Sequence, residues 1–347
     1  MIDRILIAVF GITLLVFVHE LGHYLAARAV GMRVTRFSIG IGPVLARFQP
    51  KGSPTVFQIS AIPFMAYVMI AGMNPVEEVD PNDPAIYPNK NVFARMLAIF
   101  GGPFANYLAA SIMVFGLVMT VGNRELSESG PLTVAQVSDD SPAANAGIKP
   151  DDVILKAAGR PVDNVEQLIE VTAPRAGQAT EYIVQRDGTL LPPMSITPED
   201  HDGRGIIGVT PKYEFVYRRQ NLVDGLQMAV TLPFKLTMLN LEGIFDLIER
   251  RSTEGIKGPV GMYRLVAEQV DKGIFDVVWI LIAISVALGL FNLFPLPALD
   301  GGKLVFLIYE VITRKRPNER IEATVHAVGL LFLFCVIVLV TWRDITS

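Results

Sequence analysis

The stretch LLVFVHELGHYLAARAVG (Leu14–Gly31) places His19, Glu20 and His23 inside a long apolar run. The run extends from about residue 5 to residue 30, which exceeds the roughly 20 residues that an α-helix needs to cross a bilayer. The residues before His19 climb about 21 Å at 1.5 Å per residue, so His19 is expected about two-thirds of the way across the hydrocarbon core. Ionisable side chains at that depth are costly and usually functional. The stretch therefore predicts a membrane span that carries a functional site.

The spacing of the two histidines predicts the chemistry of that site. Residues four apart share a helix face, so His19 and His23 can direct two imidazoles at one ion. In an H-E-x-x-H motif the histidines bind zinc and the glutamate acts as general base. Zinc lowers the pKa of water, and Glu20 is placed to take the proton. The alternative is two structural histidines bonded to neighbouring helices beside a neutral Glu20. The depth of the motif favours a site with one Zn²⁺ per chain.

The composition indicates a membrane protein. The chain has 347 residues, of which 51% are hydrophobic and only 18% charged, and its mean hydropathy is +0.42. The net charge is −4, and no basic patch with interleaved aromatic residues suggests nucleic acid as a partner. The single cysteine, Cys335, excludes an internal disulfide and a cysteine-based zinc site. No small-residue cleavage site precedes His19, so we expect the first apolar segment to be retained.

Four stretches are long and apolar enough to span a bilayer, which predicts a polytopic α-helical membrane protein. They are residues 5–30, 92–121, 274–299 and 324–342. The first two spans belong to an N-terminal membrane part, residues 1–130, and the last two to a C-terminal membrane part, residues 274–347.

The segment between the first two spans, about residues 32–88, is predicted to be β-rich. It alternates in hydropathy and is rich in glycine, proline and β-branched residues. One interpretation is a β-loop lying at the membrane interface. The other, which we favour, is a re-entrant sheet that dips beside the site, provided that protein or a water-filled cavity covers its backbone.

Two further segments separate the second and third spans. Residues 131–211 contain more acidic than basic residues and short β-like runs, which predict a soluble α+β domain inserted between the spans. Residues 212–273 show apolar residues at three- and four-residue spacing, which predicts amphipathic, interfacial helices broken at Pro233.

The distribution of basic residues predicts the orientation. Lysine and arginine are enriched in the loop after the first span and in TRKRPNER (313–320), between the third and fourth spans. Basic residues in short loops favour the cytoplasmic side. Both loops are therefore expected in the cytoplasm, and the soluble domain outside it. The active site would lie toward the cytoplasmic side of the membrane.

The third zinc ligand is predicted to be Asp300, in FNLFPLPALDGGK (291–303). The third span runs opposite to the first and reaches a similar depth. Pro295 and Pro297 cannot continue a helix, so the chain is expected to unwind and direct carbonyls and the Asn292 side chain into a cavity. Two alternatives are His201, on the wrong side of the membrane, and His326, for which we favour a supporting or packing role.

Together, HELGH and NLFPLPALDGG resemble the site-2 protease family of intramembrane zinc metalloproteases. The second motif matches the NxxPxPxLDG pattern of that family at every fixed position, and GGPFAN (101–106) resembles its GGPxxN stretch. SPAANAGIKPDDVILKAAGRPVDNVEQL (141–168) resembles a bacterial PDZ domain. The order of these elements is similar to that in RseP-type bacterial members.

The resemblance implies specific roles for residues of this chain. Zinc would be bound by His19, His23 and Asp300, with Glu20 as general base and acid. Substrate would be bound by Asn292, Pro295, Pro297, Gly102 and Asn106. The β-rich loop would receive substrate as an added strand, which satisfies the backbone of an unwound helix. The partners would be the lipid bilayer and single-span membrane proteins.

The resemblance also implies a biological setting. The enzyme would sit in the bacterial cytoplasmic, or inner, membrane and perform regulated intramembrane proteolysis after a prior ectodomain cut. The products would be a released regulator such as an anti-sigma fragment, or degraded signal-peptide remnants. Two other classes are a membrane-anchored PDZ binding protein with a non-catalytic metal site, and a transporter with structural zinc. The intact zinc motif opposes the first, and the lack of an inverted repeat opposes the second.

The chain departs from the RseP type in one respect, because that type carries two PDZ domains and this chain has room for one. GRGIIGV (203–209) would be the carboxylate-binding loop and strand of a circularly permuted PDZ fold that captures a C-terminal peptide. The alternative is a closed domain that only excludes large substrates.

Overall fold

The four long apolar segments of the sequence are helices. The computed structural model describes residues 2–74, 77–126, 132–201, 203–212, 215–249 and 257–346. Within these ranges, the helices long and apolar enough to cross a membrane are α1 (Ile2–Ala29), α2 (Val92–Thr120), α7 (Ile274–Asn292) and α9 (Glu319–Thr346). They are the four stretches predicted as spans, although the third helix ends at Asn292, before the two prolines.

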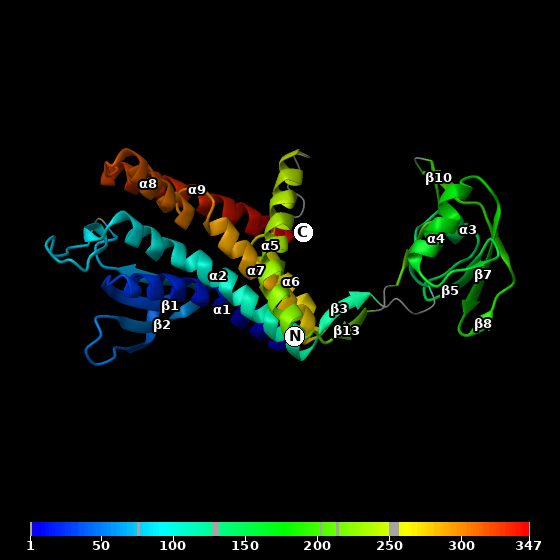
Figure 1. Cartoon of the computed structure of the whole chain (residues 1–347), viewed down its shortest axis with the longest axis horizontal. Helices are drawn as coiled ribbons and strands as arrows, with labels where there is room; N and C mark the ends of the chain where they lie inside the picture. Colours follow the sequence, from blue (N-terminus) through cyan, green and yellow to red (C-terminus); the bar gives the residue numbers. More distant parts are fainter. Residues whose placement is uncertain are drawn as a thin grey trace. The chain divides into compact units, whose positions relative to one another are not determined.

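The chain divides into two units (Figure 1). The first comprises Met1–Val121 and Gln220–Ser347 and contains all four long apolar helices. The second, Gly122–Arg219, is inserted between α2 and α5 (Leu222–Glu249). The start predicted for the soluble domain, residue 131, lies with residues 127–130 outside the described residues.

Glycines set the close crossing of α1 and α2. A Cβ atom on Gly22 would lie 2.1 Å from the carbonyl oxygen of Gly101, and one on Gly101 would lie 2.5 Å from that of Gly22. Only glycine at both positions therefore lets the two backbones approach this closely. Helix α2 begins at the Asn91 cap, whose side chain accepts a hydrogen bond from Ala94 N, and it continues through Pro103. The crossing brings the middle of α2 against the histidine face of α1.

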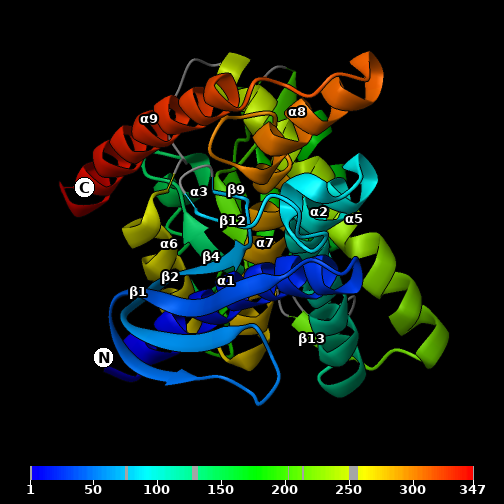
Figure 2. The same ribbon diagram turned by 90° about the vertical axis from the view of Figure 1, so that its left-hand side faces the viewer.

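Strands β1 (Val34–Phe48) and β2 (Val56–Ile70) form a small sheet that lies along α1 (Figure 2). Each strand folds back on itself. Across the sheet, the neighbouring segments are 66–70, 34–39, 56–60 and 44–48 in that order. Residues 36–39 and 56–59 run parallel to each other. The Phe37 ring lies 5.6 Å from Phe17 and 5.7 Å from Tyr24, measured between centroids. Aromatic packing on α1 therefore covers one face of the sheet.

The sequence prediction omitted a helix after the third span. Residues 293–299 are irregular, as the prolines predict, but α8 (Asp300–Thr313) then occupies most of the segment treated as a connecting loop. Its first turn packs against the irregular residues. A Cβ on Gly301 would lie 2.1 Å from the Phe294 carbonyl oxygen, and one on Gly302 would lie 2.4 Å from that of Leu296. The two glycines let Asp300 begin a helix directly over the irregular loop.

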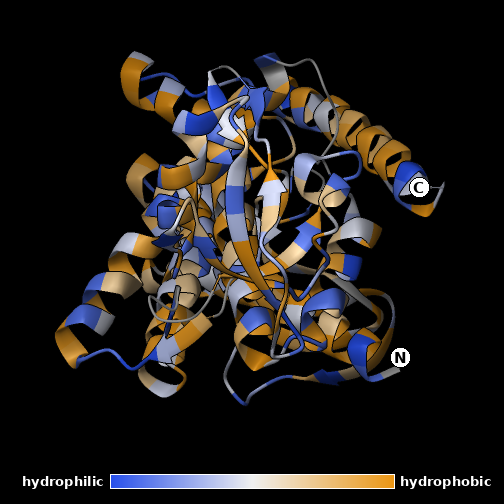
Figure 3. Ribbon diagram, turned by 90° about the vertical axis from the view of Figure 1, so that its right-hand side faces the viewer, coloured by the Kyte–Doolittle hydropathy of each residue, from blue (hydrophilic) through white to orange (hydrophobic). Residues whose placement is uncertain are grey.

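The helices between the soluble domain and the third span are α5 and α6 (Pro259–Val270). The predicted break at Pro233 is wrong, because α5 is continuous through it. A proline removes one backbone hydrogen bond but can be accommodated inside an apolar helix. Helix α9 ends beside α6, where Asp344 accepts a hydrogen bond from Gly261 N at 2.8 Å. None of its most apolar window is buried, and Figure 3 shows it hydrophobic over most of its length up to the C-terminus.

The second unit is α+β, as its composition predicts. Its main sheet has the path β12-β4-β5-β7-β8, with β6 on β5 and β9 on β7. The core packs Val134, Ile154, Leu168, Tyr182 and Val184. The strands of this sheet are β4 (Leu132–Val137), β5 (Val153–Ala157), β6 (Arg160–Pro161), β7 (Thr180–Arg186), β8 (Thr189–Leu190), β9 (Met194–Ile196) and β12 (Val209–Pro211).

Shorter elements complete the description. Two-stranded pairs are formed by β3 (Asn123–Leu126) with β13 (Phe215–Arg218) and by β10 (Glu199–His201) with β11 (Arg204–Ile206). The helices of the second unit are α3 (Pro142–Asn145), α4 (Val165–Thr172) and the 3₁₀ turn η2 (Ala173–Arg175); the 3₁₀ turn η1 (Tyr87–Asn89) precedes α2. Asn164 caps α4, since its Oδ1 accepts a hydrogen bond from Gln167 N at 2.9 Å.

Candidate metal centre

Three side chains from α1 and α8 converge on one point. The Nε2 atoms of His19 and His23 are 3.2 Å apart. Asp300 Oδ2 lies 3.2 Å from the first and 3.1 Å from the second. Tetrahedral zinc with ligand distances of 2.0–2.1 Å separates its ligand atoms by about 3.3 Å. The three atoms therefore have the spacing of one face of a zinc tetrahedron.

The Asp300 oxygen also lacks another partner. Asp300 Oδ2 is buried and makes no hydrogen bond to the described residues. A buried carboxylate oxygen without a hydrogen bond is costly unless it is paired with a cation. Within the described chain, these three residues form the group of histidine, cysteine or acidic side chains arranged to hold a metal. The residues present fit a zinc ion.

The hydrogen bond on the far side of His23 fixes its tautomer. His23 Nδ1 lies 2.9 Å from the Ala98 carbonyl oxygen, which can only accept, so Nδ1 carries the hydrogen. Nε2 is left with a lone pair directed at the convergence point. In metal sites, a hydrogen bond from the ring nitrogen that does not bind the metal orients the histidine and increases its basicity.

Asn106 lies beside Nδ1 of His19, as the Ala98 carbonyl does beside Nδ1 of His23. Its amide nitrogen is 3.0 Å from His19 Nδ1, and its Oδ1 is buried and makes no hydrogen bond within the described residues. If His19 Nε2 gives its lone pair to a metal, Nδ1 carries the hydrogen and needs an acceptor. Turning the Asn106 amide by 180° supplies that acceptor and removes the unpaired oxygen. Both histidines are thus held by α2, through Ala98 and Asn106.

Two residues expected to contact substrate instead contact the histidines. Asn106 is 0% exposed. A Cβ on Gly102 would lie 2.3 Å from His23 Nε2, so the imidazole lies directly over this glycine. The two residues are four apart in α2 and so share its face toward α1. These contacts follow from the close crossing of α1 and α2.

The loop before Asp300 is held by α9. His326 Nδ1 accepts a hydrogen bond from Ala298 N at 3.0 Å, and Ala298 adopts a left-handed backbone with φ of 73°. Pro297 packs against Gly329, where a Cβ would lie 2.2 Å from the proline Cβ. His326 therefore lies outside the cluster, as its favoured supporting role predicts. The other alternative ligand, His201, belongs to β10 in the second unit.

The remaining predicted substrate residues lie near the end of α7. The Asn292 side chain donates to the Leu288 carbonyl at 3.0 Å, one turn earlier. Pro295 is exposed, whereas Pro297 is half-buried against α9. Pro295 therefore presents the most accessible surface of the three.

Glu20 is half-buried and follows His19 directly on α1. Its carboxylate makes no hydrogen bond or ion pair with the described residues, and it lies within electrostatic reach of His19, His23 and Asp300. The carboxylate is thus available beside the cluster without belonging to it.

An ion pair that the sequence did not indicate fixes α8 to α2. Arg95 Nη2 lies 2.5 Å from Glu310 Oε1, and both side chains are largely buried. The Arg95 guanidinium also lies 5.8 Å from the centre of the Tyr87 ring. Because α8 begins with Asp300, the pair sets the position of the third candidate ligand. A lone arginine at the start of an apolar run was the available signal.

Comparison with known proteins identifies the family. The profile of peptidase family M50 matches residues 7–336. Similar proteins described as "Putative zinc metalloprotease" occur in Nostoc sp. (30% identity, 95% of this chain and 92% of that protein), Synechocystis sp. (32%, 96% and 92%) and Fusobacterium nucleatum (28%, 98% and 98%). The chain belongs to peptidase family M50, the site-2 protease family. It is a membrane protein and a zinc metalloprotease.

A PDZ domain is among the solved structures that are similar to part of this chain. A PDZ domain of an SdrC-like protein from Listeria monocytogenes is 21% identical and covers 25% of this chain and 92% of that domain, with a TM-score of 0.22.

Proposed function

We propose that this metalloprotease cuts transmembrane helices of single-span membrane proteins within the bilayer, after another protease has removed the substrate's ectodomain. The observation that carries the proposal is the convergence of His19 Nε2, His23 Nε2 and Asp300 Oδ2 at 3.1–3.2 Å. His19 and His23 lie inside an apolar span, so a hydrolytic site built on them acts at membrane depth. The proposed outcome is regulated intramembrane proteolysis, such as release of an anti-sigma fragment or removal of signal-peptide remnants.

The residues divide the chemistry among them. His19, His23 and Asp300 hold one zinc ion per chain, which acidifies water and polarises the scissile carbonyl when bound. Glu20 takes the proton from the attacking water and delivers it to the leaving amide nitrogen. Ala98 and Asn106 hold the two imidazoles in the tautomer that leaves Nε2 free.

An unwound substrate would bind as an added strand. Residues 44–48 form the outer segment of the β1–β2 sheet and pair on one side with residues 57–60. Residues 44–48 are all exposed. Strand addition there satisfies the backbone of a helix that has been opened for cleavage. Asn292 and Pro295, at the end of α7, would contact the substrate backbone, and the packing of Pro297 on α9 would hold that loop in place.

The cellular placement is part of the proposal. The basic loops favour a bacterial cytoplasmic membrane in which the β1–β2 sheet and the active site are toward the cytoplasm. The inserted unit then lies on the extracytoplasmic, periplasmic side. It would act as a single PDZ domain. Among the described strands β12 pairs only with β4 and ends the sheet path, and an edge of this kind suits a C-terminal peptide.

The test uses the full chain in detergent with two single-span substrates, one intact and one with its ectodomain removed. We expect cleavage of the shortened substrate only, inhibition by a zinc chelator and recovery on adding zinc. Glu20→Gln should abolish cleavage while retaining one equivalent of zinc, whereas Asp300→Ala should lose the zinc. Glu242→Gln, an exposed acid on α5, serves as the matched control. Cleavage by Glu20→Gln at the wild-type rate would refute the mechanism, and equal cleavage of both substrates would refute the need for a prior cut.

A further inference from the structure

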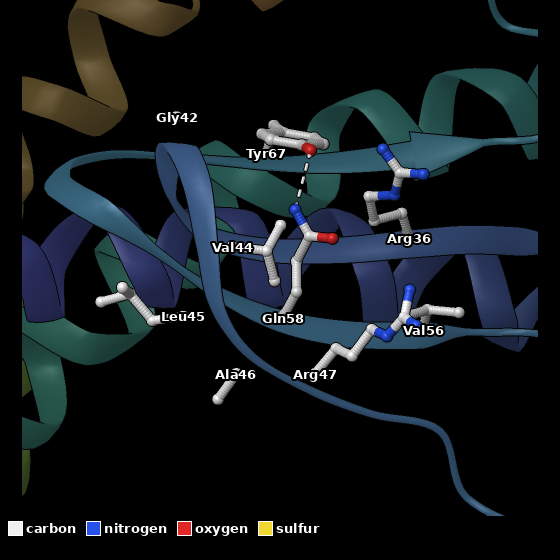
Figure 4. A pocket seen from close by; sticks show the side chains of 9 residues that line it. All are labelled: Arg36, Gly42, Val44, Leu45, Ala46, Arg47, Val56, Gln58 and Tyr67. Atoms are coloured by element: carbon white, nitrogen blue, oxygen red, sulfur yellow. Dashed lines mark hydrogen bonds between the residues drawn. The ribbon is translucent and has the colours of Figure 1, made fainter.

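A hollow on the β1–β2 sheet carries two arginines that have no ion-pair partner among the described residues. It has a volume of about 580 Å³, and its lining includes Arg36, Arg47, Gln58 and Tyr67. Figure 4 shows these side chains extending from one face of the sheet, with α1 behind the opposite face. The metal centre uses none of them. Within the described part of the chain, neither Arg36 nor Arg47 makes an ion pair or a side-chain hydrogen bond.

The strand register explains why polar groups gather there. Tyr67 pairs with Ser38, Ser38 with Gln58, and Gln58 with Arg47, so one row of directly opposed residues crosses all four segments. Opposed residues lie on the same face of a sheet, and Arg36 joins them two residues before Ser38.

The neighbouring row in the register faces the other way. It consists of Val68, Phe37, Phe57 and Phe48, and Phe37 and Phe57 pack against aromatic rings of α1. One face of the sheet is therefore anchored on α1, and the other is left polar.

Hydrogen bonds within the row leave a particular set of groups unused. Gln58 Nε2 donates to Ser38 Oγ and to Tyr67 Oη, both at 3.1 Å. Tyr67 therefore accepts through its oxygen and retains its hydroxyl hydrogen for another acceptor. The side-chain amide oxygen of Gln58, Oε1, has no hydrogen bond to the described residues. The hollow thus offers two guanidinium groups, one hydroxyl donor and one carbonyl acceptor.

The sheet places these groups near the end of the first span. Phe37 contacts Tyr24, which lies five residues before the end of α1 and hence about 7.5 Å from it along the axis. That is close to the depth of lipid headgroups. Beside the hollow, Val44 and Leu45 are 49% and 70% exposed. An arginine without an acidic partner at this depth is attracted to the anionic groups of the membrane surface.

We propose that this hollow binds the phosphate of an anionic phospholipid headgroup. Guanidinium groups bind phosphate oxygens in a forked, charge-assisted geometry. A phosphodiester has no hydroxyl of its own, so the Gln58 carbonyl would accept from the next group of the headgroup, such as a glycerol hydroxyl. Val44 and Leu45 contact the first carbons of the acyl chains. The bound lipid would hold the outer strand, residues 44–48, at a fixed depth.

The test is native mass spectrometry of the full chain in detergent, titrated with short-chain phosphatidylglycerol, the matching diacylglycerol or inorganic phosphate. We expect one phosphatidylglycerol to bind and the affinity to fall at least tenfold in Arg36→Gln/Arg47→Gln. Arg28→Gln/Arg320→Gln removes two exposed arginines elsewhere and should bind as the wild type does. Arg36→Lys/Arg47→Lys keeps the positive charge but removes the forked guanidinium geometry, and its lipid affinity should lie between those of the wild type and the glutamine variant. Zinc content reports that each variant is folded.

The proposal fails if Arg36→Gln/Arg47→Gln and Arg28→Gln/Arg320→Gln lose the same affinity for phosphatidylglycerol. It also fails if diacylglycerol binds as well as phosphatidylglycerol. Inorganic phosphate that binds as tightly as phosphatidylglycerol, with the same arginine dependence, would make free phosphate the ligand. If Arg36→Gln/Arg47→Gln binds lipid normally but fails to cleave a substrate with acidic flanking residues, the arginines serve the substrate instead. Each of these results is independent of whether Glu20 acts as the general base.

Discussion

The side-chain amide nitrogen of Asn106 on α2 lies 3.0 Å from Nδ1 of His19 on α1, and the amide oxygen of Asn106, Oδ1, is buried and makes no hydrogen bond to the described residues. The contact joins two spans at the proposed zinc site. It makes Asn106 a positioning residue for His19, because the hydrogen bond at Nδ1 decides which tautomer the imidazole adopts.

Loss of this contact should weaken zinc binding. Asn106→Ala is expected to lower zinc affinity by about 10–100-fold, which is typical of removing the hydrogen-bond partner of a metal-binding histidine. Asn106→Asp retains an acceptor and should restore most of the affinity. Competition with a fluorescent chelator measures both variants. Equal affinity of Asn106→Ala and the wild type would show that His19 does not depend on this amide.

Substitution of Gly102 should displace His23. A Cβ there would lie 2.3 Å from His23 Nε2, so Gly102→Ala is expected to lose zinc and proteolysis together. Gly116→Ala is the matched control in the same helix, because a Cβ at Gly116 has no atom within 4 Å. Zinc content per chain and cleavage rate are the measurements. Normal zinc content in Gly102→Ala would contradict the proposed contact.

His326 should support the loop without binding zinc. His326→Ala removes the acceptor for Ala298 N, and leaving that backbone donor unsatisfied should cost about 1–3 kcal/mol. We expect the variant to retain zinc but cleave more slowly, as Asp300 becomes less well positioned. Asp300→Ala, which should lose zinc, provides the comparison. Zinc loss in His326→Ala as complete as that in Asp300→Ala would make His326 a ligand.

The buried Arg95–Glu310 pair should be sensitive to loss of one partner. Glu310→Ala leaves the Arg95 guanidinium buried without its carboxylate, which typically costs about 3–5 kcal/mol. Replacing both residues by methionine should be far less destabilising, because no charge is left unpaired. Thermal unfolding in detergent compares the two. If Glu310→Ala and the double variant have the same stability, the pair does not fix α8 to α2.

The inserted unit should lose stability in acid through Asp152. Burial raises the pKa of this carboxyl, but two hydrogen bonds from Arg186 at 2.7 and 2.8 Å and one from Lys149 N outweigh it, so the pKa falls below its usual value. The stabilisation is complete above the unfolded pKa of about 3.9 and disappears as pH falls through the lower folded pKa.

Asp152→Asn should remove this pH dependence and cost about 1.5–3 kcal/mol at neutral pH, the range for a hydrogen bond to a charged group. Hydrogen exchange of β5 and β7 in the full chain, followed from pH 6 to pH 2, measures it. Asp151→Asn is the control, because the side chain of Asp151 is 74% exposed. Equal acid sensitivity in the wild type and Asp152→Asn would rule out this carboxyl as the cause.

Local patterns in the chain were sufficient to predict the spans and the three residues that converge. A run of about 20 apolar residues forms a membrane helix wherever it occurs, and residues four apart share a helix face. Asp300 could be paired with the histidines because two prolines stop a helix at a predictable depth. These conclusions need only spacing, composition and the geometry of one helix.

The roles of Gly102 and Asn106, the pairing of Arg95 with Glu310, and the polar row on the β1–β2 sheet were decided by tertiary structure. Each depends on contacts between segments distant in the chain: Asn106 is 87 residues from His19, and Glu310 is 215 residues from Arg95. The HELGH stretch by itself determined that two imidazoles share one face of a long apolar helix. Only the crossing of α1 and α2 determined how these imidazoles are held. The two backbones can approach this closely because neither Gly22 nor Gly101 has a side chain at the crossing point.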